Sequence, residues 1–187
     1  MWNNDSEQTV NRWEYLLTPE SQARYALAAY YVRDCPIVVE VGAWKNCIAD
    51  YLKPNHLVIV IDPLAECSPK QGQEVEVIKE SLQDVDLTSL RGNDYGLVFL
   101  GFELVGEKSF IAMEKFINMA NDAKIVVLEY ALKHAPSVEQ VGEFLRRCGK
   151  REFFRIKLDI SGNAMSLPSD SYPPFCERMF IVLKEDR

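Results

Sequence analysis

Acidic side chains recur in this sequence beside the ends of short apolar, β-branched runs. Glu40 lies near the end of Ile37–Val41, and Asp62 follows Leu57–Ile61, 22 positions after Glu40. Such runs are typical of buried parallel strands, whose carboxyl ends meet at one edge of an open α/β sheet. Nucleotide-binding folds hold ribose hydroxyls with a carboxylate about twenty residues past the first turn. The spacing therefore indicates a ligand of the nucleotide type. The alternative for each of the two residues is a carboxylate that contacts only solvent.

Three later apolar runs are also predicted to be strands, at residues 75–79, 95–100 and 124–128. They are followed by Glu80-Ser81, by Gly101-Phe102-Glu103 and by Glu129-Tyr130. If the reaction needs a proton acceptor, the candidates on this edge are His134, Tyr130 and Glu103. A surface position without a function is the alternative for His134. His56 precedes the second strand, away from this edge, and is read as structural.

Cysteine usage favours neither a disulfide framework nor a metal site. The five cysteines are odd in number, widely spaced and without a C-x-x-C pair: Cys35, Cys47, Cys67, Cys148 and Cys176. No histidine lies near Cys47 or Cys67 in the sequence, so a cysteine nucleophile is not expected either. We expect reduced thiols and no bound metal.

Composition excludes several other classes of protein. The chain has 187 residues, of which 48% are hydrophobic, enough to bury one good core. No apolar run approaches the roughly 18 residues of a membrane span, and the N-terminus lacks a signal-peptide pattern. The net charge of −7 argues against a nucleic-acid surface. The sequence therefore predicts a cytoplasmic, single-domain protein without a membrane or nucleic-acid partner.

Helices are predicted before and between these strands. Asp5 caps a first short helix, and Thr18 and Pro19 begin a second that ends before Pro36. Further helical patterns follow Gly42, cover residues 107–120, and begin at Ser137 with a capping box. The basic cluster Arg146, Arg147, Lys150 and Arg151 reads as the last turn of that helix, with a phosphate-binding patch as the alternative.

Two final strands, residues 153–160 and 179–183, are not separated by a helix. The count is then seven strands with helices alternating among the first five, which predicts a mainly parallel sheet with right-handed crossovers. The last strand is expected to be antiparallel. A loop over residues 161–176 joins the final pair. We expect it to cover an acceptor site or contact another subunit, with an idle surface loop as the alternative.

The combination of Glu40-Val41-Gly42, Asp62 and the helical segment 24–32 resembles class I S-adenosylmethionine-dependent methyltransferases. The resemblance implies a three-layer α/β sandwich with strand order 3-2-1-4-5-7-6 and added N-terminal helices. Residues 1–187 would form a single domain, with a helical cap over 1–34 and an α/β core over 35–187. The cofactor implied is S-adenosylmethionine.

The resemblance also implies where that cofactor binds. Its contacts would come from Glu40, Gly42, Ala43, Trp44, Asp62, Pro63, Ser81, Leu82 and Gly101. Backbone amides of a helix starting near Asn46 would bind an anionic group. The family has two or three glycines where this chain has Gly42 alone, followed by Ala43, Trp44 and Lys45. Trp44 stacks on a ligand or fills its place, and both readings stay open.

Two functions remain open at this point. The first is a methyltransferase for a small-molecule acceptor, because no N-P-P-Y or D-P-P-Y follows the fourth strand, which disfavours DNA bases or glutamine. The second is a methyltransferase-like protein without catalysis, serving as a binding or partner subunit. A homodimer or a protein partner fits either function.

Overall fold

The computed structural model describes residues 18–43, 46–67, 69–86, 90, 94–100, 107–131, 138–149, 151–159, 161–167 and 178–184. The first predicted helix, before Thr18, lies outside these residues. No helix among them is long and apolar enough to cross a membrane.

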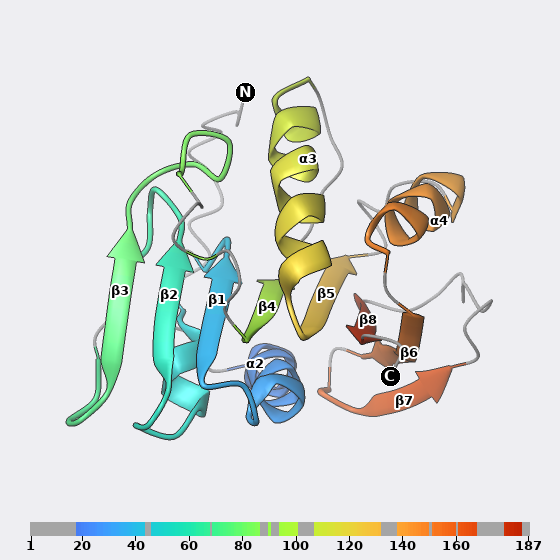
Figure 1. Cartoon of the computed structure of the whole chain (residues 1–187). Coiled ribbons are helices and arrows are strands. Elements are labelled where there is room, and N and C mark those ends of the chain that lie inside the picture. The colour runs from blue at the N-terminus through green and yellow to red at the C-terminus, as the bar shows by residue number, and fades with distance from the viewer. Residues whose placement is uncertain are drawn as a thin grey trace, which may run out of the picture.

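One mixed sheet forms the centre of the molecule (Figure 1). Its strands are β1 (Ile37–Val41), β2 (Leu57–Ile61), β3 (Glu74–Ile78), β4 (Tyr95–Leu100), β5 (Ile125–Ala131), β6 (Arg151–Leu158), β7 (Ala164–Leu167) and β8 (Arg178–Lys184). Their order is β3-β2-β1-β4-β5-β8-β6-β7. The first five strands pair in parallel, and β8 runs antiparallel to both β5 and β6.

The predicted order 3-2-1-4-5-7-6 is confirmed for the seven expected strands, but the predicted count of seven is wrong. The additional strand, β7, lies within the segment predicted to be a loop and pairs antiparallel with β6 at the sheet edge. Ala164, Met165 and Ser166 are all exposed. β7 has only four residues, of which Leu167 alone is half-buried, so its pattern is too short to predict a strand from the sequence.

Helices cover both faces of the sheet. On one face α3 (Glu107–Asp122) and α4 (Val138–Arg147) bury Phe116 and Phe144 against Val39 and Val41 of β1. On the other face α2 (Pro19–Val32) and the short 3-10 helix η1 (Ile48–Tyr51) pack on Val38. Because side chains alternate along a strand, Glu40 points to the same face as Val38.

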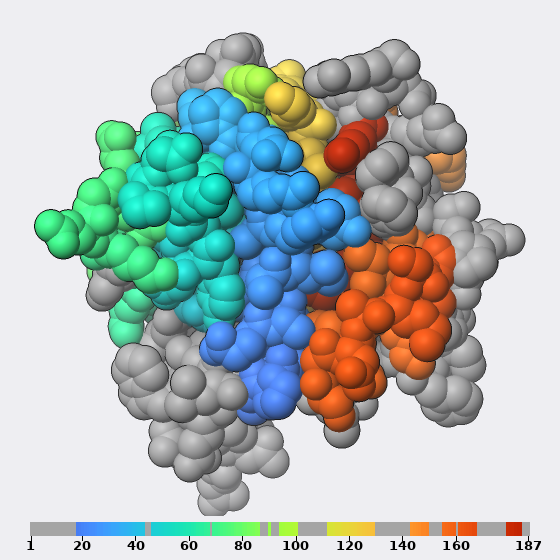
Figure 2. Space-filling view, turned by 90° about the horizontal axis from the view of Figure 1, so that it is seen from below, coloured from blue at the N-terminus to red at the C-terminus, as the bar shows by residue number. Residues whose placement is uncertain are grey.

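The second predicted helix is confirmed as α2. The side chain of Thr18 accepts a hydrogen bond from the amide of Ser21 at 3.2 Å, and Pro19 occupies the first turn. The helix ends at Val32, where it approaches β4 closely: a Cβ on Gly96 would lie 2.9 Å from the Val32 side chain. Seen from below (Figure 2), α2 runs between the β1–β2 connection and the β6–β7 hairpin.

Two local predictions need correction. The connection from β1 to β2 contains η1, a single 3-10 turn, where the sequence predicted a helix spanning Ile48 and Leu52. Pro54 disfavours helical backbone at the residue before it, and Leu52 is already extended. The fifth strand was predicted to end at Leu128, but β5 continues to Ala131. The strand therefore contains Glu129 rather than ending before it.

Candidate functional site

The order β2-β1-β4 defines a switch point in the sheet. The chain leaves β1 toward β2 on one side, whereas β4 continues to β5 on the other side. In open α/β sheets, ligands bind beyond the carboxyl ends of the strands at such a point. Here that place is the turn after Val41, so the residues of this turn form the candidate site.

Gly42 gives this turn its shape. Its φ is +77°, a left-handed backbone conformation that residues with a side chain rarely adopt. Its amide donates to the carbonyl of Ile61 at 3.0 Å. A Cβ at this position would lie 3.2 Å from Cε2 of Phe99 in β4. The glycine therefore lets the chain turn sharply and pass close to β4.

Glu40 places a fully buried carboxyl group directly before the turn. Its Oε2 accepts a hydrogen bond from the amide of Ile48 at 2.8 Å. Its Oε1 is buried and makes no hydrogen bond with any residue that the structure describes. Burial raises the pKa of this carboxyl well above its ordinary value, and the nearby thiol of Cys47 and carboxyl of Asp62 add to the rise.

Replacing Glu40 by glutamine should stabilise the protein, increasingly so as the pH rises. Because the folded-state pKa of Glu40 lies above the ordinary 4.5, the folded protein keeps a proton that the unfolded chain releases. The stability from that proton is complete below the unfolded pKa and is lost as the pH rises through the folded pKa. Glutamine still accepts from Ile48 and never ionises. The variant should exceed the wild-type free energy of unfolding by about 1–2 kcal/mol near pH 8, and match it near pH 4.

Urea denaturation of the two proteins across this pH range measures the difference. Glu76→Gln is the matched control, because Glu76 is exposed on β3 and the same chemical change there removes no buried charge. A stability difference that stays constant or shrinks with rising pH would show that Glu40 is not the group that retains the proton.

Asn46 is a site residue that the sequence analysis did not include among the cofactor contacts. It is 8% exposed, and its Oδ1 accepts from the amide of Cys47 at 3.1 Å. Its side-chain amide lies beside the Tyr51 hydroxyl: burial raises the pKa of that hydroxyl, and the Asn46 amide opposes the rise. Asn46 and Glu40 accept from the amides of two consecutive residues, Cys47 and Ile48.

The prediction of an anion site at the backbone amides near Asn46 is wrong. The amides of Cys47 and Ile48 donate to side chains of the protein itself, and that of Asp50 donates to the carbonyl of Cys47. The helix expected there is reduced to the four residues of η1.

Asp62 lies at the end of β2, 9% exposed, where the sequence placed it. Its Oδ1 accepts from the amide of Leu64 at 2.6 Å, and its carbonyl accepts from Ala65 at 3.2 Å. These bonds stabilise the turn that contains the exposed Pro63. A carboxylate accepts up to about four hydrogen bonds, so one side chain can serve both a turn and another donor.

The residues after β3 divide between the surface and the core. Ser81 is half-buried, and its carbonyl accepts from the amide of Asp84 at 2.8 Å. Leu82 is 7% exposed and belongs to the hydrophobic core on the α3 side of the sheet. Because β3 pairs with β2, both residues follow a strand next to Asp62.

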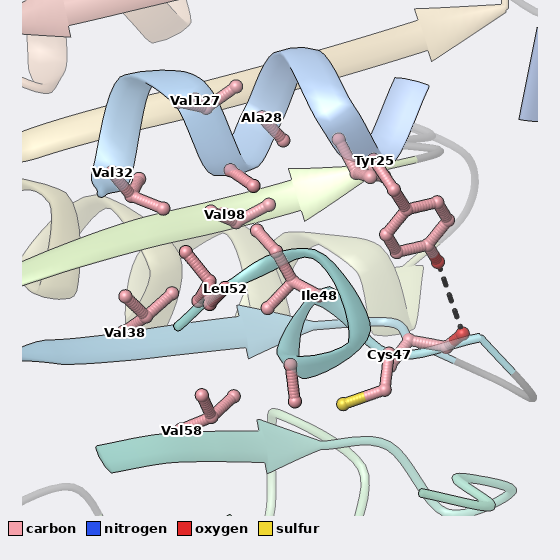
Figure 3. Close-up of a cluster of buried hydrophobic side chains, with 14 of the residues drawn as sticks. Tyr25, Ala28, Val32, Val38, Cys47, Ile48, Leu52, Val58, Val98 and Val127 are labelled. Carbon is pink, nitrogen blue, oxygen red and sulfur yellow. Dashed lines mark hydrogen bonds between the residues drawn. The ribbon is translucent and has the colours of Figure 1, made fainter. Parts of the chain in front are cut away.

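Residues in the first turns of α2 also lie at this edge of the sheet. The sequence analysis did not predict their contacts. Arg24 and Glu129 of β5 form a buried ion pair at 2.7 Å. Tyr25 stacks on Tyr51 with ring centroids 5.4 Å apart, and its hydroxyl donates to the carbonyl of Ala43 at 3.5 Å. Figure 3 shows Tyr25 reaching from α2 to the chain that follows β1.

Several predicted site residues lie outside the described residues: Trp44, Gly101, Glu103 and His134. The backbone of Tyr130 lies in β5. The three catalytic candidates therefore stay predictions. Within the described residues, no group of three or more histidine, cysteine, aspartate or glutamate side chains could hold a metal ion.

His56 and the basic cluster have structural partners. His56 is 4% exposed, with its two ring nitrogens 2.9 and 2.8 Å from the carbonyls of Lys53 and Arg33. Arg146 and Arg147 lie in the last turn of α4, where they form ion pairs with Glu143 and Glu114. These contacts favour the structural reading of both features over a ligand site.

The chain was compared with known proteins. No protein-family model and no curated protein sequence matches it. Solved structures match along nearly the whole chain. A TehB-like SAM-dependent methyltransferase from Corynebacterium glutamicum is 20% identical, with a TM-score of 0.62, over 97% of this chain and 98% of that chain.

Two further structures hold ligands. The N-methyltransferase NodS from Bradyrhizobium japonicum, in complex with S-adenosyl-l-homocysteine, is 11% identical, with a TM-score of 0.65, over 96% of this chain and 94% of that chain. The 1,6-didemethyltoxoflavin-N1-methyltransferase from Burkholderia thailandensis, with bound 1,6-didemethyltoxoflavin and S-adenosylhomocysteine, is 12% identical. Its TM-score is 0.60, over 93% of this chain and 81% of that chain. The chain has the Rossmann-like fold of class I S-adenosylmethionine-dependent methyltransferases, as predicted.

Proposed function

We propose that this protein is an S-adenosylmethionine-dependent methyltransferase that acts on a small-molecule acceptor in the cytoplasm. The observation that carries the proposal is the buried carboxyl of Glu40 at the switch point, whose Oε1 has no hydrogen bond among the described residues. A buried acceptor without a partner is costly, and a bound ligand with a cationic group would remove that cost.

The residues of the site fit this cofactor. Glu40 offers an acceptor to its cationic end, Asp62 offers one to its ribose hydroxyls, and Gly42 adds no side chain at the first position of the turn after β1. Ala43, Trp44, Pro63, Ser81, Leu82 and Gly101 are proposed to line the rest of the cofactor. When bound, the cofactor supplies an electrophilic methyl group.

The acceptor would bind on the β4 and β5 side of the switch point. If it is a hydroxyl or an amine, His134, Tyr130 and Glu103 are the candidates to take its proton. The net charge of −7 disfavours RNA or DNA as the acceptor. A small molecule is therefore the proposed acceptor, and a homodimer or protein partner is compatible with it.

Titration calorimetry with S-adenosylhomocysteine and S-adenosylmethionine tests the proposal. We expect binding to the wild type, and a loss of affinity of about tenfold or more in Asp62→Ala, because ribose hydroxyls lose a charged acceptor. Asp84→Ala is the control, since Asp84 is exposed beyond the end of β3, and should change the affinity far less. Absence of binding to the wild type up to about millimolar ligand would refute the proposal.

A second candidate is a methyltransferase-like partner subunit without catalysis. Two observations favour it. Asp62 Oδ1 already accepts a hydrogen bond from the amide of Leu64, and Leu82 belongs to the hydrophobic core. Under this hypothesis Asp62→Ala lowers the stability of the turn, and neither the wild type nor any variant binds the two ligands. The same calorimetry therefore separates the two functions.

A further inference from the structure

Two cysteines come from the two turns that flank the candidate site. Cys47 lies in the turn after β1, directly before η1, and Cys67 follows the turn after β2, twenty positions later. Cys47 is 3% exposed and Cys67 is half-buried, and both are free thiols. Neither thiol serves as a ligand group in the proposed function.

The chain after β2 folds back onto η1 and brings the two cysteines together. The side chains of Lys70 and Gln73 donate hydrogen bonds to backbone carbonyls of η1. Ala65 belongs to the same buried cluster as Cys47, and Cys67 packs against that cluster. Figure 3 shows Cys47 among these buried side chains. Polar and apolar contacts of the same connection therefore set the separation of the two thiols.

The thiols of Cys47 and Cys67 are in contact. The Cys47 thiol donates a hydrogen bond to the sulfur of Cys67, and this bond is the largest cause that raises the pKa of Cys47 well above its ordinary value. Burial adds to the rise. A disulfide joins two sulfurs at about 2 Å, and it cannot form between side chains that point apart. Sulfurs that already contact each other meet this requirement.

The difference in exposure gives the two cysteines different parts in an oxidation. Thiol–disulfide exchange begins when an accessible thiol attacks as its thiolate. Cys67 is the more exposed of the two, whereas Cys47 is buried and held in its protonated form. A small disulfide should therefore react first at Cys67. Cys47, which is in contact with that sulfur, should then displace the small molecule from it.

We propose that Cys47 and Cys67 form a reversible dithiol–disulfide site, oxidised by a low-molecular-weight disulfide such as glutathione disulfide. The Cys67 sulfur bonds to one glutathione sulfur, and the other glutathione leaves with the Cys67 proton. The Cys47 sulfur then bonds to the Cys67 sulfur, and the remaining glutathione leaves with the Cys47 proton. Two thiols are oxidised and one glutathione disulfide is reduced to two glutathione molecules. The inference does not depend on the proposed function.

Glutathione buffers test the site in the folded, full-length protein. The reduced protein is equilibrated with rising proportions of glutathione disulfide, quenched in acid, alkylated and mapped as peptides by mass spectrometry. We expect the peptides of Cys47 and Cys67 to become linked, with the loss of two hydrogen atoms, and excess glutathione to separate them again. Cys47→Ala should stop at a mixed disulfide on Cys67, and Cys67→Ala should leave Cys47 as a thiol. Cys35→Ala removes another buried thiol as the matched control, and should become linked as the wild type does.

Urea denaturation gives a second measurement. A disulfide from residue 47 to residue 67 closes a loop and restricts the unfolded chain, so oxidation should raise the urea midpoint of the wild type by about 1 M. The same rise is expected in Cys35→Ala. Oxidation should leave the midpoints of Cys47→Ala and Cys67→Ala unchanged.

The outcomes are distinct. Linked peptides from the folded wild type, together with a higher urea midpoint, support the inference. Five intact thiols at the highest proportion of glutathione disulfide overturn it, as does a mixed disulfide on Cys67 that persists in the wild type. Pairing of Cys47 or Cys67 with another cysteine, a link that forms only in urea, or a midpoint that falls on oxidation also overturns it, because the native fold would then not hold these thiols ready to join.

Discussion

Replacing Arg24 by methionine is expected to lower the free energy of unfolding by about 3–5 kcal/mol. The ion pair between Arg24 and Glu129 is buried, with side chains 9% and 0% exposed. Removing the guanidinium leaves the carboxylate of Glu129 in the interior without its cation at 2.7 Å. Denaturation in urea measures the loss, and the melting temperature should fall by roughly 10 °C for a chain of this size.

The double variant Arg24→Met/Glu129→Gln tests the cause of this loss. If the main cost is the buried Glu129 charge that has lost the Arg24 guanidinium, neutralising Glu129 should return a large part of the stability lost in Arg24→Met. Lys70→Met serves as the control for loss of a cation, because its contact with Asp50 is exposed, and should cost under about 1 kcal/mol. A double variant as unstable as Arg24→Met would instead assign the effect to lost packing by the arginine side chain.

Replacing Gly162 by alanine is expected to cost about 2–4 kcal/mol of stability. Gly162 lies between β6 and β7 with a φ of +81°, a conformation that disfavours any side chain. Its added Cβ would also lie 2.8 Å from the carbonyl oxygen of Pro19, at the start of α2. Because that oxygen belongs to the backbone, either the hairpin or the helix must move.

Gly72→Ala separates the two contributions. Gly72 has a similar φ of +79°, but among the described residues an added Cβ would meet only Cβ of Pro54, at an ordinary 3.9 Å. The control should therefore show the backbone cost alone, about 1 kcal/mol. Urea denaturation of both variants gives the comparison. Equal losses would mean that the hairpin does not pack tightly on α2.

Both predictions concern α2, which contacts three separate parts of the chain near the site. Arg24 pairs with β5, Tyr25 contacts the turn after β1, and the β6–β7 hairpin packs on the first turn. These contacts hold α2 against the edge of the sheet where a ligand is proposed to bind. Variants that loosen it should affect stability and cofactor affinity together.

The sequence predicted the strands that line the site. The apolar runs of β1, β2 and β4 match the structure residue for residue, because burial on both faces leaves an uninterrupted apolar signal. The period of two in a strand puts Glu40 on the same face as Val38, and only the structure shows that α2 covers that face. Seven strands in the expected order followed from this signal and from the family resemblance.

The sequence did not reveal features that depend on contacts across the fold. β7 has four residues, three of them exposed, which is too short a pattern to predict a strand. η1 stands where an α-helix was expected, because Pro54 disfavours helical backbone at the residue before it. Glu129 read as the polar end of a strand, since its partner Arg24 lies 105 positions away. A contact between residues so far apart in the sequence produces no periodic pattern in either segment.

The sequence by itself determined the core strands, the glycine turn and the two carboxylates at the ends of β1 and β2, because these follow from local apolar patterns and from spacing along the chain. Only the tertiary structure decided which polar atoms of the site are already satisfied. The amides of Cys47 and Ile48 are used by Asn46 and Glu40, and one atom of each side chain is left without a partner among the described residues. Hydrogen bonding depends on distances of a few tenths of an ångström, which packing sets and residue types alone do not.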